Sequence, residues 1–245
     1  ETLARDIFNG GVGLIFESGF TRKEYSIPIN GLIWMGDESF MLEQMEEKLA
    51  DGFTTIKMKV GAIKWEKEYA LLEQLRQRFS SKELTLRVDA NGAFTPKSAL
   101  PILKQLSDLE VHSIEQPIQA GQVTAMSELC KQSPIGIALD EELIGIHESE
   151  EKEALLKMIA PPFIVLKPSL HGGMNGCSEW IRLAEENQIA WWMTSALESS
   201  IGLNAIAQFT ATFDDLLPQG LGTGGLYTNN FESSLVVSKG QLRIS

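Results

Sequence analysis

Three acidic residues end apolar, β-branched segments of this chain at nearly equal intervals. Asp89, Glu115 and Asp140 close these segments, and 26 and then 25 residues separate them. A strand, a helix and two short loops need about that many residues, so each acid falls at one level of a repeating β/α unit. A single acid at a buried strand end is usually a helix cap or half of an ion pair, because desolvating a carboxylate is costly. Three acids at matched depth predict a shared metal site.

The donor types indicate which metal such a site would hold. Carboxylate oxygens suit a hard cation, so we expect Mg²⁺, with Mn²⁺ as a possible substitute. No cysteine or histidine recurs at the same positions, which argues against zinc.

Three lysines accompany the acids. Lys57 and Lys59 are two apart in an earlier β-type segment, so both side chains project from one face of a strand. Lys167 ends a later segment, 27 residues after Asp140. A lysine in a partly dry site, beside a second lysine and a divalent cation, has a lowered pKa and can act as a general base. Plain ion pairs between these lysines and acids are the alternative interpretation.

The elements that must position these residues alternate along the chain. Eight β-type segments are nearly continuous apolar runs, as in parallel strands that are buried on both faces. They are Gly31–Trp34, Thr54–Val60, Thr85–Asp89, Val111–Glu115, Ile135–Asp140, Phe163–Lys167, Ala190–Thr194 and Leu216–Gln219. Amphipathic helical patterns lie between them: Phe40–Leu49, Trp65–Phe79, a helix that Thr95 and Pro96 begin, Ala120–Lys131, Glu150–Ile159, Cys177–Asn187 and Ile201–Phe213. Eight strands favour an α/β barrel, which runs to about 250 residues, over an open doubly wound sheet.

Composition limits the function classes. The 245 residues carry a net charge of −12 without a run of Lys or Arg, so we expect no nucleic acid as a partner. An anionic small molecule can still bind if a metal and a few lysines reverse the field locally. No apolar stretch reaches the ~18 residues of a membrane span, and no signal peptide is visible, so we expect a cytoplasmic protein. Cys130 and Cys177 have no metal-type spacing and are expected to be free thiols.

Two further segments concern ligand binding. Residues 220–225 match G-x-G-x-x-G, but no helical pattern follows, so a loop whose N–H groups approach an anionic substrate is preferred to a dinucleotide site. Ser195 and Ser199 follow the seventh strand and precede a helix. Either could cap that helix, and a substrate carboxylate could bind near the same helix N-terminus.

Five motifs, in order, resemble the enolase superfamily in its muconate-lactonising subgroup. They are Lys57-Met58-Lys59, Asp89-Ala90-Asn91-Gly92, Ile114-Glu115-Gln116-Pro117, Leu139-Asp140-Glu141 and Leu166-Lys167-Pro168. The resemblance implies a TIM-type barrel, modified to (β/α)₇β, with Mg²⁺ ligands at Asp89, Glu115 and Asp140 and catalytic lysines at 57, 59 and 167. It also adds Asn91, Ser195, Ser199, Gly222 and Thr223 as candidate substrate-binding residues.

The same resemblance implies a capping domain beside the barrel. We therefore expect residues 1–30 to be the end of an N-terminal capping region, 31–225 the barrel, and 226–245 a return to the cap. The last part has the pattern of a hairpin, with strands around residues 235–237 and 241–244. Because the chain begins with Glu rather than Met, we expect most of the capping region to be missing.

For activity, the segment from Ser195 to Gly202 and the Gly222-Thr223-Gly224 motif are similar to those of the superfamily's dehydratases of menaquinone biosynthesis. This similarity implies that Lys59 removes a proton α to a carboxylate, Lys57 lowers the pKa of Lys59, and Lys167 faces the intermediate before water is lost. Racemisation of N-acylamino acids or epimerisation of dipeptides would use Lys59 and Lys167 equally well. A non-catalytic barrel with ion-paired charges is the alternative from another class.

Overall fold

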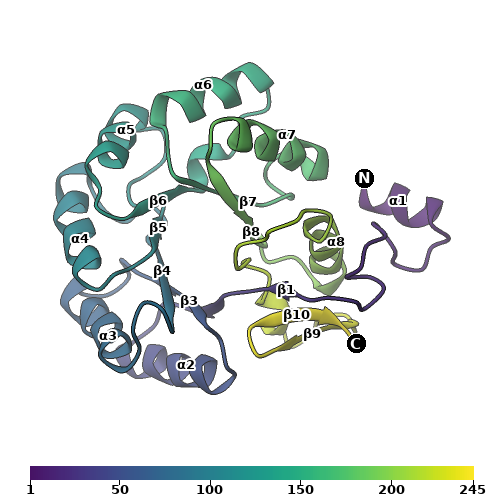
Figure 1. Cartoon of the computed structure of the whole chain (residues 1–245), viewed down its shortest axis with the longest axis horizontal. Helices are drawn as coiled ribbons and strands as arrows, with labels where there is room; N and C mark the ends of the chain where they lie inside the picture. The colour runs from purple at the N-terminus through teal and green to yellow at the C-terminus, as the bar shows by residue number, and fades with distance from the viewer.

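The computed structural model describes residues 1–245, and its central feature is a curled parallel sheet. Seven strands follow one another around the sheet in chain order, with helices outside them (Figure 1). The strands are β2 Gly31–Ile33, β3 Thr55–Lys59, β4 Thr85–Asp89, β5 Ser113–Glu115, β6 Gly136–Leu139, β7 Phe163–Leu166 and β8 Ala190–Met193. Each lies within one of the segments expected from sequence. Parallel neighbours joined by helical crossovers form the wall of a TIM-type barrel, which confirms the expected fold class.

A short segment links the two edges of this sheet. Gly220 bridges to Thr194, just beyond β8, and Gln219 bridges to Ile29, just before β2, both in parallel orientation. The N–H of Asn30 donates to the carbonyl of Gln219 at 2.9 Å. The ring is therefore continuous, but its closure depends on single bridges.

The eighth strand is shorter than the sequence predicts. The expected strand was Leu216–Gln219, whereas only Gln219 and Gly220 make bridges in the structure. Pro218 has no N–H to donate, so a ladder cannot extend backwards through it. The apolar run leads into the bridges that close the barrel wall, as predicted, but its proline limits the pairing.

A helix follows each of the seven strands. The helices are α2 Glu38–Ala50, α3 Trp65–Arg78, α4 Pro96–Asp108, α5 Val123–Gln132, α6 Ser149–Ile159, α7 Gly173–Glu186 and α8 Ser200–Thr210, and two short 3₁₀ turns cover Glu141–Leu143 and Thr223–Gly225. At the start of α4, Thr95 and Ser98 form a capping box, as the Thr95-Pro96 pair predicts. The remaining helix boundaries differ from the expected ones by a few residues.

Apolar side chains fill two separate regions. One cluster of 51 buried residues includes Ile137, Ile164 and Leu166, the residues that alternate with the site-facing positions of their strands. A second, small cluster holds Ala138, Val165 and Trp192. Because strand side chains alternate between faces, the second cluster shares the interior face with the charged strand ends. The charged strand ends therefore share the barrel interior with this small apolar cluster and with buried Arg87, whose guanidinium lies 4.1 Å from the Trp192 ring.

A second, smaller sheet joins the segment just before the barrel to the C-terminal residues. β1 (Ile27–Pro28) pairs with β10 (Gln241–Ile244), and β10 pairs with β9 (Leu235–Ser238), all antiparallel. The expected C-terminal hairpin is confirmed, while the division of the chain at residues 30 and 225 stays a prediction. The remaining helix, α1 (Thr2–Phe8), buries none of its residues. None of the helices has both the length and the apolar character that a membrane crossing requires.

Candidate active site

The two lysines of β3 project together into one end of the barrel. Lys57 Nζ lies 2.9 Å from Glu115 Oε2 and 3.5 Å from Asp89 Oδ2. Lys59 Nζ donates to Asp89 Oδ2 at 2.8 Å and to Asn91 Oδ1 at 2.6 Å. Met58, between the two lysines, packs into the large core. Strand alternation thus separates the charged face of β3 from its apolar face, as predicted.

Asp89 and Glu115 are the last residues of β4 and β5, and Asp140 directly follows the last residue of β6. Asp89 pairs in register with Glu115, and Glu115 pairs with Ala138, two residues before Asp140. Strands of a barrel are tilted, so this stagger brings side chains at successive register steps to the same end. All three acids are buried, with relative exposures of 1% for Asp89, 2% for Glu115 and 0% for Asp140.

Each of the three acids has an ammonium partner. Lys167, across the mouth, donates to Asp140 Oδ2, while Asp140 Oδ1 has no hydrogen-bond partner. The lysines are also mostly buried, so these pairs lie where water screens charge weakly. The site is an alternating set of three ammonium and three carboxylate groups.

Burial and the charges of neighbouring groups together set the direction of the pKa shifts in this site. Burial and the charge of Asp89 raise the pKa of Glu115 well above its ordinary value. Burial opposes the charge on Lys57 and Lys167, but the neighbouring carboxylates outweigh it and raise the pKa of both lysines. Burial also opposes the charge of Asp89, yet the nearby Lys57 and Lys59 lower its pKa.

The sequence predicts a base whose pKa is lowered by a second lysine and a divalent cation, and that stays a prediction. For Lys57 and Lys167 the pKa is raised, because buried carboxylates lie beside both ammonium groups. A divalent cation bound by these acids would lower the pKa of both lysines.

The carboxylate oxygens of the three acids are the ligand type that a hard cation prefers, but their present positions do not surround one ion. Asp140 Oδ1 is a buried oxygen without a partner, and the Lys57 ammonium already lies between two carboxylates. However, no three acidic, His or Cys side chains are grouped closely enough to hold one ion as they stand. The ligand role of Asp89, Glu115 and Asp140 therefore stays a prediction, and it requires the lysine contacts to rearrange.

Two residues beside the site had been assigned no role from the sequence. Glu141 accepts a hydrogen bond from Asn91 Nδ2 at 2.9 Å, and its Oε2 has no partner. Burial and the charge of Asp140 raise the pKa of Glu141. The Trp34 ring lies 5.5 Å from Lys59 Nζ, within cation–π range. Two consecutive acids at 140 and 141 could have identified Glu141 as a neighbour of the site. For Trp34, the only signal in the sequence was its position at the end of an expected strand.

The candidate substrate-binding residues fall into two groups. Asn91 contacts Lys59, as described above. Ser195 and Thr223 lie on the other side of the mouth, where their hydroxyls are 2.6 Å apart and both residues are buried. Gly222 is exposed beside Thr223.

The helix-capping expectation for Ser195 and Ser199 is wrong. Ser199 occupies the N-cap position of α8, but its side chain makes no capping bond. The N–H of Ser200 instead donates to Asn230 Oδ1 at 2.8 Å. A distant loop residue supplies this cap, so local sequence could not identify it.

A cavity of about 510 Å³ opens beside this second group. Gly222 and Thr223 line it together with Trp34 and Asn30. Asn30 is buried, and its Oδ1 has no hydrogen-bond partner. Much of its remaining wall comes from α2 and the loop that follows, including Phe40, Lys48 and Phe53, so the cavity adjoins the surroundings of Lys59 only at Trp34.

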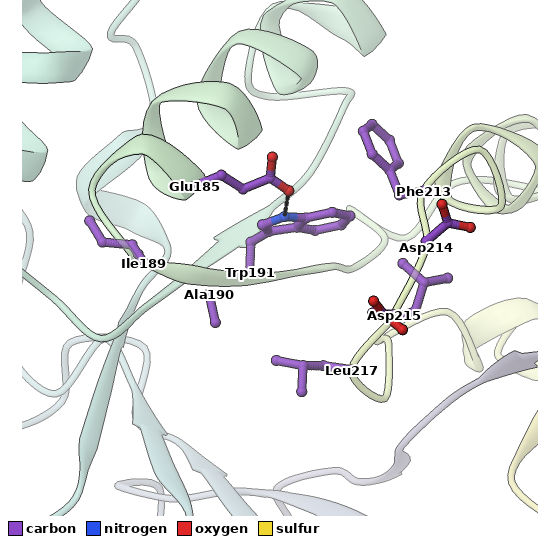
Figure 2. Close-up of a pocket in the computed structure, with 9 residues that line it drawn as sticks. Glu185, Ile189, Ala190, Trp191, Phe213, Asp214, Asp215 and Leu217 are labelled. Carbon is purple, nitrogen blue, oxygen red and sulfur yellow. Dashed lines mark hydrogen bonds between the residues drawn. The ribbon is translucent and has the colours of Figure 1, made fainter.

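Another cavity, of about 460 Å³, is remote from the charged strand ends. Figure 2 shows Trp191 and Phe213 on its sides, with Glu185 accepting a hydrogen bond from the Trp191 indole N–H at 3.3 Å. Its wall includes Ala190, the first residue of β8, so it lies toward the N-terminal ends of the strands. None of the candidate site residues lines it.

Comparisons with known proteins place this geometry in context. The family model described as "Enolase C-terminal domain-like" matches residues 41–245. An o-succinylbenzoate synthase of Desulfotalea psychrophila is 54% identical over all 245 residues, which make up 66% of that relative. An L-Ala-D/L-Glu epimerase of Bacillus subtilis is 26% identical over 70% of this chain and 46% of its own length. The crystal structure of MenC from D. psychrophila superimposes with a TM-score of 0.91 at 52% identity, covering 98% of this chain and 66% of that one. The chain thus spans just under two thirds of the length of these relatives, or less.

Proposed function

Because this chain belongs to the enolase C-terminal domain-like family, we propose that it removes a proton α to a carboxylate and then eliminates water, giving o-succinylbenzoate for menaquinone biosynthesis. The observation that carries the proposal is the alternation of three lysines and three acids at one end of the barrel. The 54% identity to an o-succinylbenzoate synthase supports this choice of reaction.

Asp89, Glu115 and Asp140 would hold Mg²⁺, or Mn²⁺ in its place. Such an ion would stabilise the negative charge that develops on the substrate carboxylate when the α-proton leaves. Enolase-superfamily sites pair a Lys or His base with one or two Mg²⁺ ions. The unpartnered Asp140 Oδ1 supports the assignment.

Lys59 is the proposed base. If Asp89 turned towards the ion, Lys59 Nζ would be released from the 2.8 Å contact that it makes with Asp89 Oδ2. Lys59 would then take the α-proton and could return it to the departing hydroxyl if both leave from one face. Lys167 would face the opposite side of the bound substrate, where its charge opposes the developing anion.

Substrate recognition is assigned to both groups of candidate residues. Asn91 would orient the substrate next to Lys59, and Ser195, Ser199, Gly222 and Thr223 would contact it from the far side of the mouth. The adjoining cavity supplies volume for the part of the molecule that does not react.

Product analysis tests this proposal. The protein would be incubated with Mg²⁺ and the cyclohexadiene substrate of o-succinylbenzoate synthase, and the aromatic product measured by its ultraviolet absorbance and by mass spectrometry. We expect product with Mg²⁺ and none after chelation. An intact, folded protein that binds Mg²⁺ and leaves this substrate unchanged would rule the reaction out.

A racemase or epimerase is the second candidate. It is favoured by the two lysines, 59 and 167, that reach the mouth from β3 and from the end of β7, and by the similarity to an L-Ala-D/L-Glu epimerase. Incubation with an N-acylamino acid in D₂O distinguishes the two reactions, because two-sided proton transfer would place deuterium at the α-carbon.

A non-catalytic barrel is the remaining alternative, since every acid of the site already has a lysine partner. Titration with Mg²⁺ decides this point. An ion-paired mouth that serves only stability would take up no Mg²⁺ at millimolar concentration.

A further inference from the structure

Gln116 lies directly behind the three acids and has all of its side-chain hydrogen bonds satisfied. Its Oε1 accepts the backbone N–H groups of Asp140 at 3.1 Å and Glu142 at 3.3 Å. Its Nε2 donates to the carbonyl of Ile118 at 3.0 Å and to Glu142 Oε2 at 3.2 Å. The residue is completely buried. An amide with two donor hydrogens and two acceptor lone pairs is the one side-chain type that matches these four partners.

The backbone of Gln116 adds two more connections. Its N–H donates to the carbonyl of Ala138 on β6 at 2.9 Å, and its carbonyl accepts the N–H of Gly92, in the loop after β4, at 2.7 Å. Its φ of 39° lies in the left-handed region, which a glutamine rarely adopts. The chain therefore turns sharply immediately after Glu115, and the surrounding bonds hold that turn in place.

These contacts connect the segments that carry all three acids. Gln116 follows Glu115 in the chain, fixes the N–H of Asp140 through its side chain, and fixes the loop that follows Asp89 through its carbonyl. It touches none of the three carboxylates. Its position thus controls the spacing of the acids without supplying a ligand.

We propose that Gln116 is a positioning residue that sets the spacing of Asp89, Glu115 and Asp140 for a divalent cation, with Glu142 as its charged partner. This inference rests on the proposed function, because it assumes that the three acids bind a metal. Residues that orient metal ligands from behind typically change affinity by about 10–100-fold when replaced.

Glu142 makes a reciprocal test possible. Its Oε2 accepts from Gln116, and its Oε1 accepts the N–H of Gly121 at 3.0 Å. In Gln116→Glu, two carboxylates would face each other across this contact. In the double variant Gln116→Glu/Glu142→Gln, the amide and the carboxylate exchange places, so one donor and one acceptor again meet.

The experiment is a Mg²⁺ titration by calorimetry of the full chain and its variants, each shown to be folded by circular dichroism. Gln116→Met should weaken Mg²⁺ binding by about 10–100-fold, and Gln116→Glu by a similar factor. The double variant should regain part of the affinity that Gln116→Glu loses, because the contact with residue 142 is restored while the Ile118 carbonyl still lacks its donor. Gln119→Met is the matched control, since Gln119 is exposed and its side chain makes no bond. It should bind Mg²⁺ as the parent does.

The outcomes separate this inference from the function on which it rests. A parent protein that takes up no Mg²⁺ overturns both. A parent protein that binds Mg²⁺, with Gln116→Met matching Gln119→Met, overturns the positioning role alone. A double variant as weak as Gln116→Glu overturns the pairing with Glu142. Should Gln116→Met fail to fold, Gln116→Asn, which keeps the amide but shortens it, takes its place with the same expected loss.

Discussion

The rim of the barrel has two unlike sides. On the charged side, from β3 to β7, strands pair in continuous register and end in buried lysines and acids. On the closing side, between β8 and β2, residues 219 and 220 make single bridges, and the nearby candidates are hydroxyls and glycines. Buried charges are costly when misplaced, so they depend on rigid strands. Neutral groups that contact a substrate can be positioned adequately by the less extensive backbone pairing of the closing side.

The largest effect should come from the charged side. Replacing Lys59 with Ala removes the proposed base, so kcat should fall by at least ~10²–10⁴-fold. Mg²⁺ binding should persist, because Lys59 is not a proposed ligand. Steady-state kinetics and a Mg²⁺ titration check the two parts. Comparable turnover in the variant would mean that another group is the base.

Adding one methyl group at Gly220 should disrupt the bridge that joins it to Thr194 on the closing side. A Cβ on Gly220 would lie 2.7 Å from Thr194 Cβ and 3.3 Å from Thr194 Cα, across one of the bridges. Gly220→Ala should therefore lower the free energy of unfolding by up to about 3 kcal/mol.

Gly222→Ala is the matched control for this change. A Cβ there would meet its nearest neighbour, Ile29 Cδ1, at 3.4 Å, which is ordinary contact. Stability measured by urea unfolding should change by less than about 0.5 kcal/mol. Equal losses in the two variants would show that the bridges do not limit the closure.

Acid should weaken the charged side through His171. Its Nδ1 accepts the N–H of Lys167 at 2.9 Å, and burial, which outweighs the attraction of Asp140, lowers its pKa to about 4. The unfolded chain has a histidine pKa near 6.5, so it binds the proton first as pH falls. The stability from neutral His171 is present above about pH 6.5 and is lost between there and pH 4, by roughly 2 kcal/mol at pH 5.

His171→Asn tests this pH dependence, because asparagine keeps an acceptor for the Lys167 N–H and does not titrate. Urea unfolding at pH 7.5 and at pH 5 should show a smaller loss in the variant than in the parent protein. An identical loss in both would assign the acid sensitivity to other groups.

The smallest effect is expected at the paired hydroxyls. Ser195→Ala removes the 2.6 Å contact with Thr223 Oγ1 and should cost about 1 kcal/mol of stability. If these hydroxyls contact the substrate, KM should rise while kcat changes little. A fall in kcat as large as that of Lys59→Ala would give Ser195 a role in the chemistry itself.

Much of the charged side could be predicted from the sequence. Lys57, Lys59, Asp89, Glu115, Asp140 and Lys167 stand at the ends of apolar segments, and the structure brings them to one end of the barrel. Alternation along strands and the equal spacing of β/α units determine this result, and both are visible in the chain. The closing side was predicted less well, because Pro218 shortens the eighth strand and Asn230, 30 residues away, caps α8 at Ser200.

By itself, the sequence determined the barrel, the order of its strands and which residues reach the charged end, because periodicity and spacing are local properties. Only the tertiary structure decided which lysine faces which acid, that Glu115 and Asp89 outweigh burial and raise the pKa of Lys57, and that Gln116 connects three strand ends. Those outcomes depend on distances between residues far apart in the chain, and electrostatic and hydrogen-bond energies change steeply with such distances.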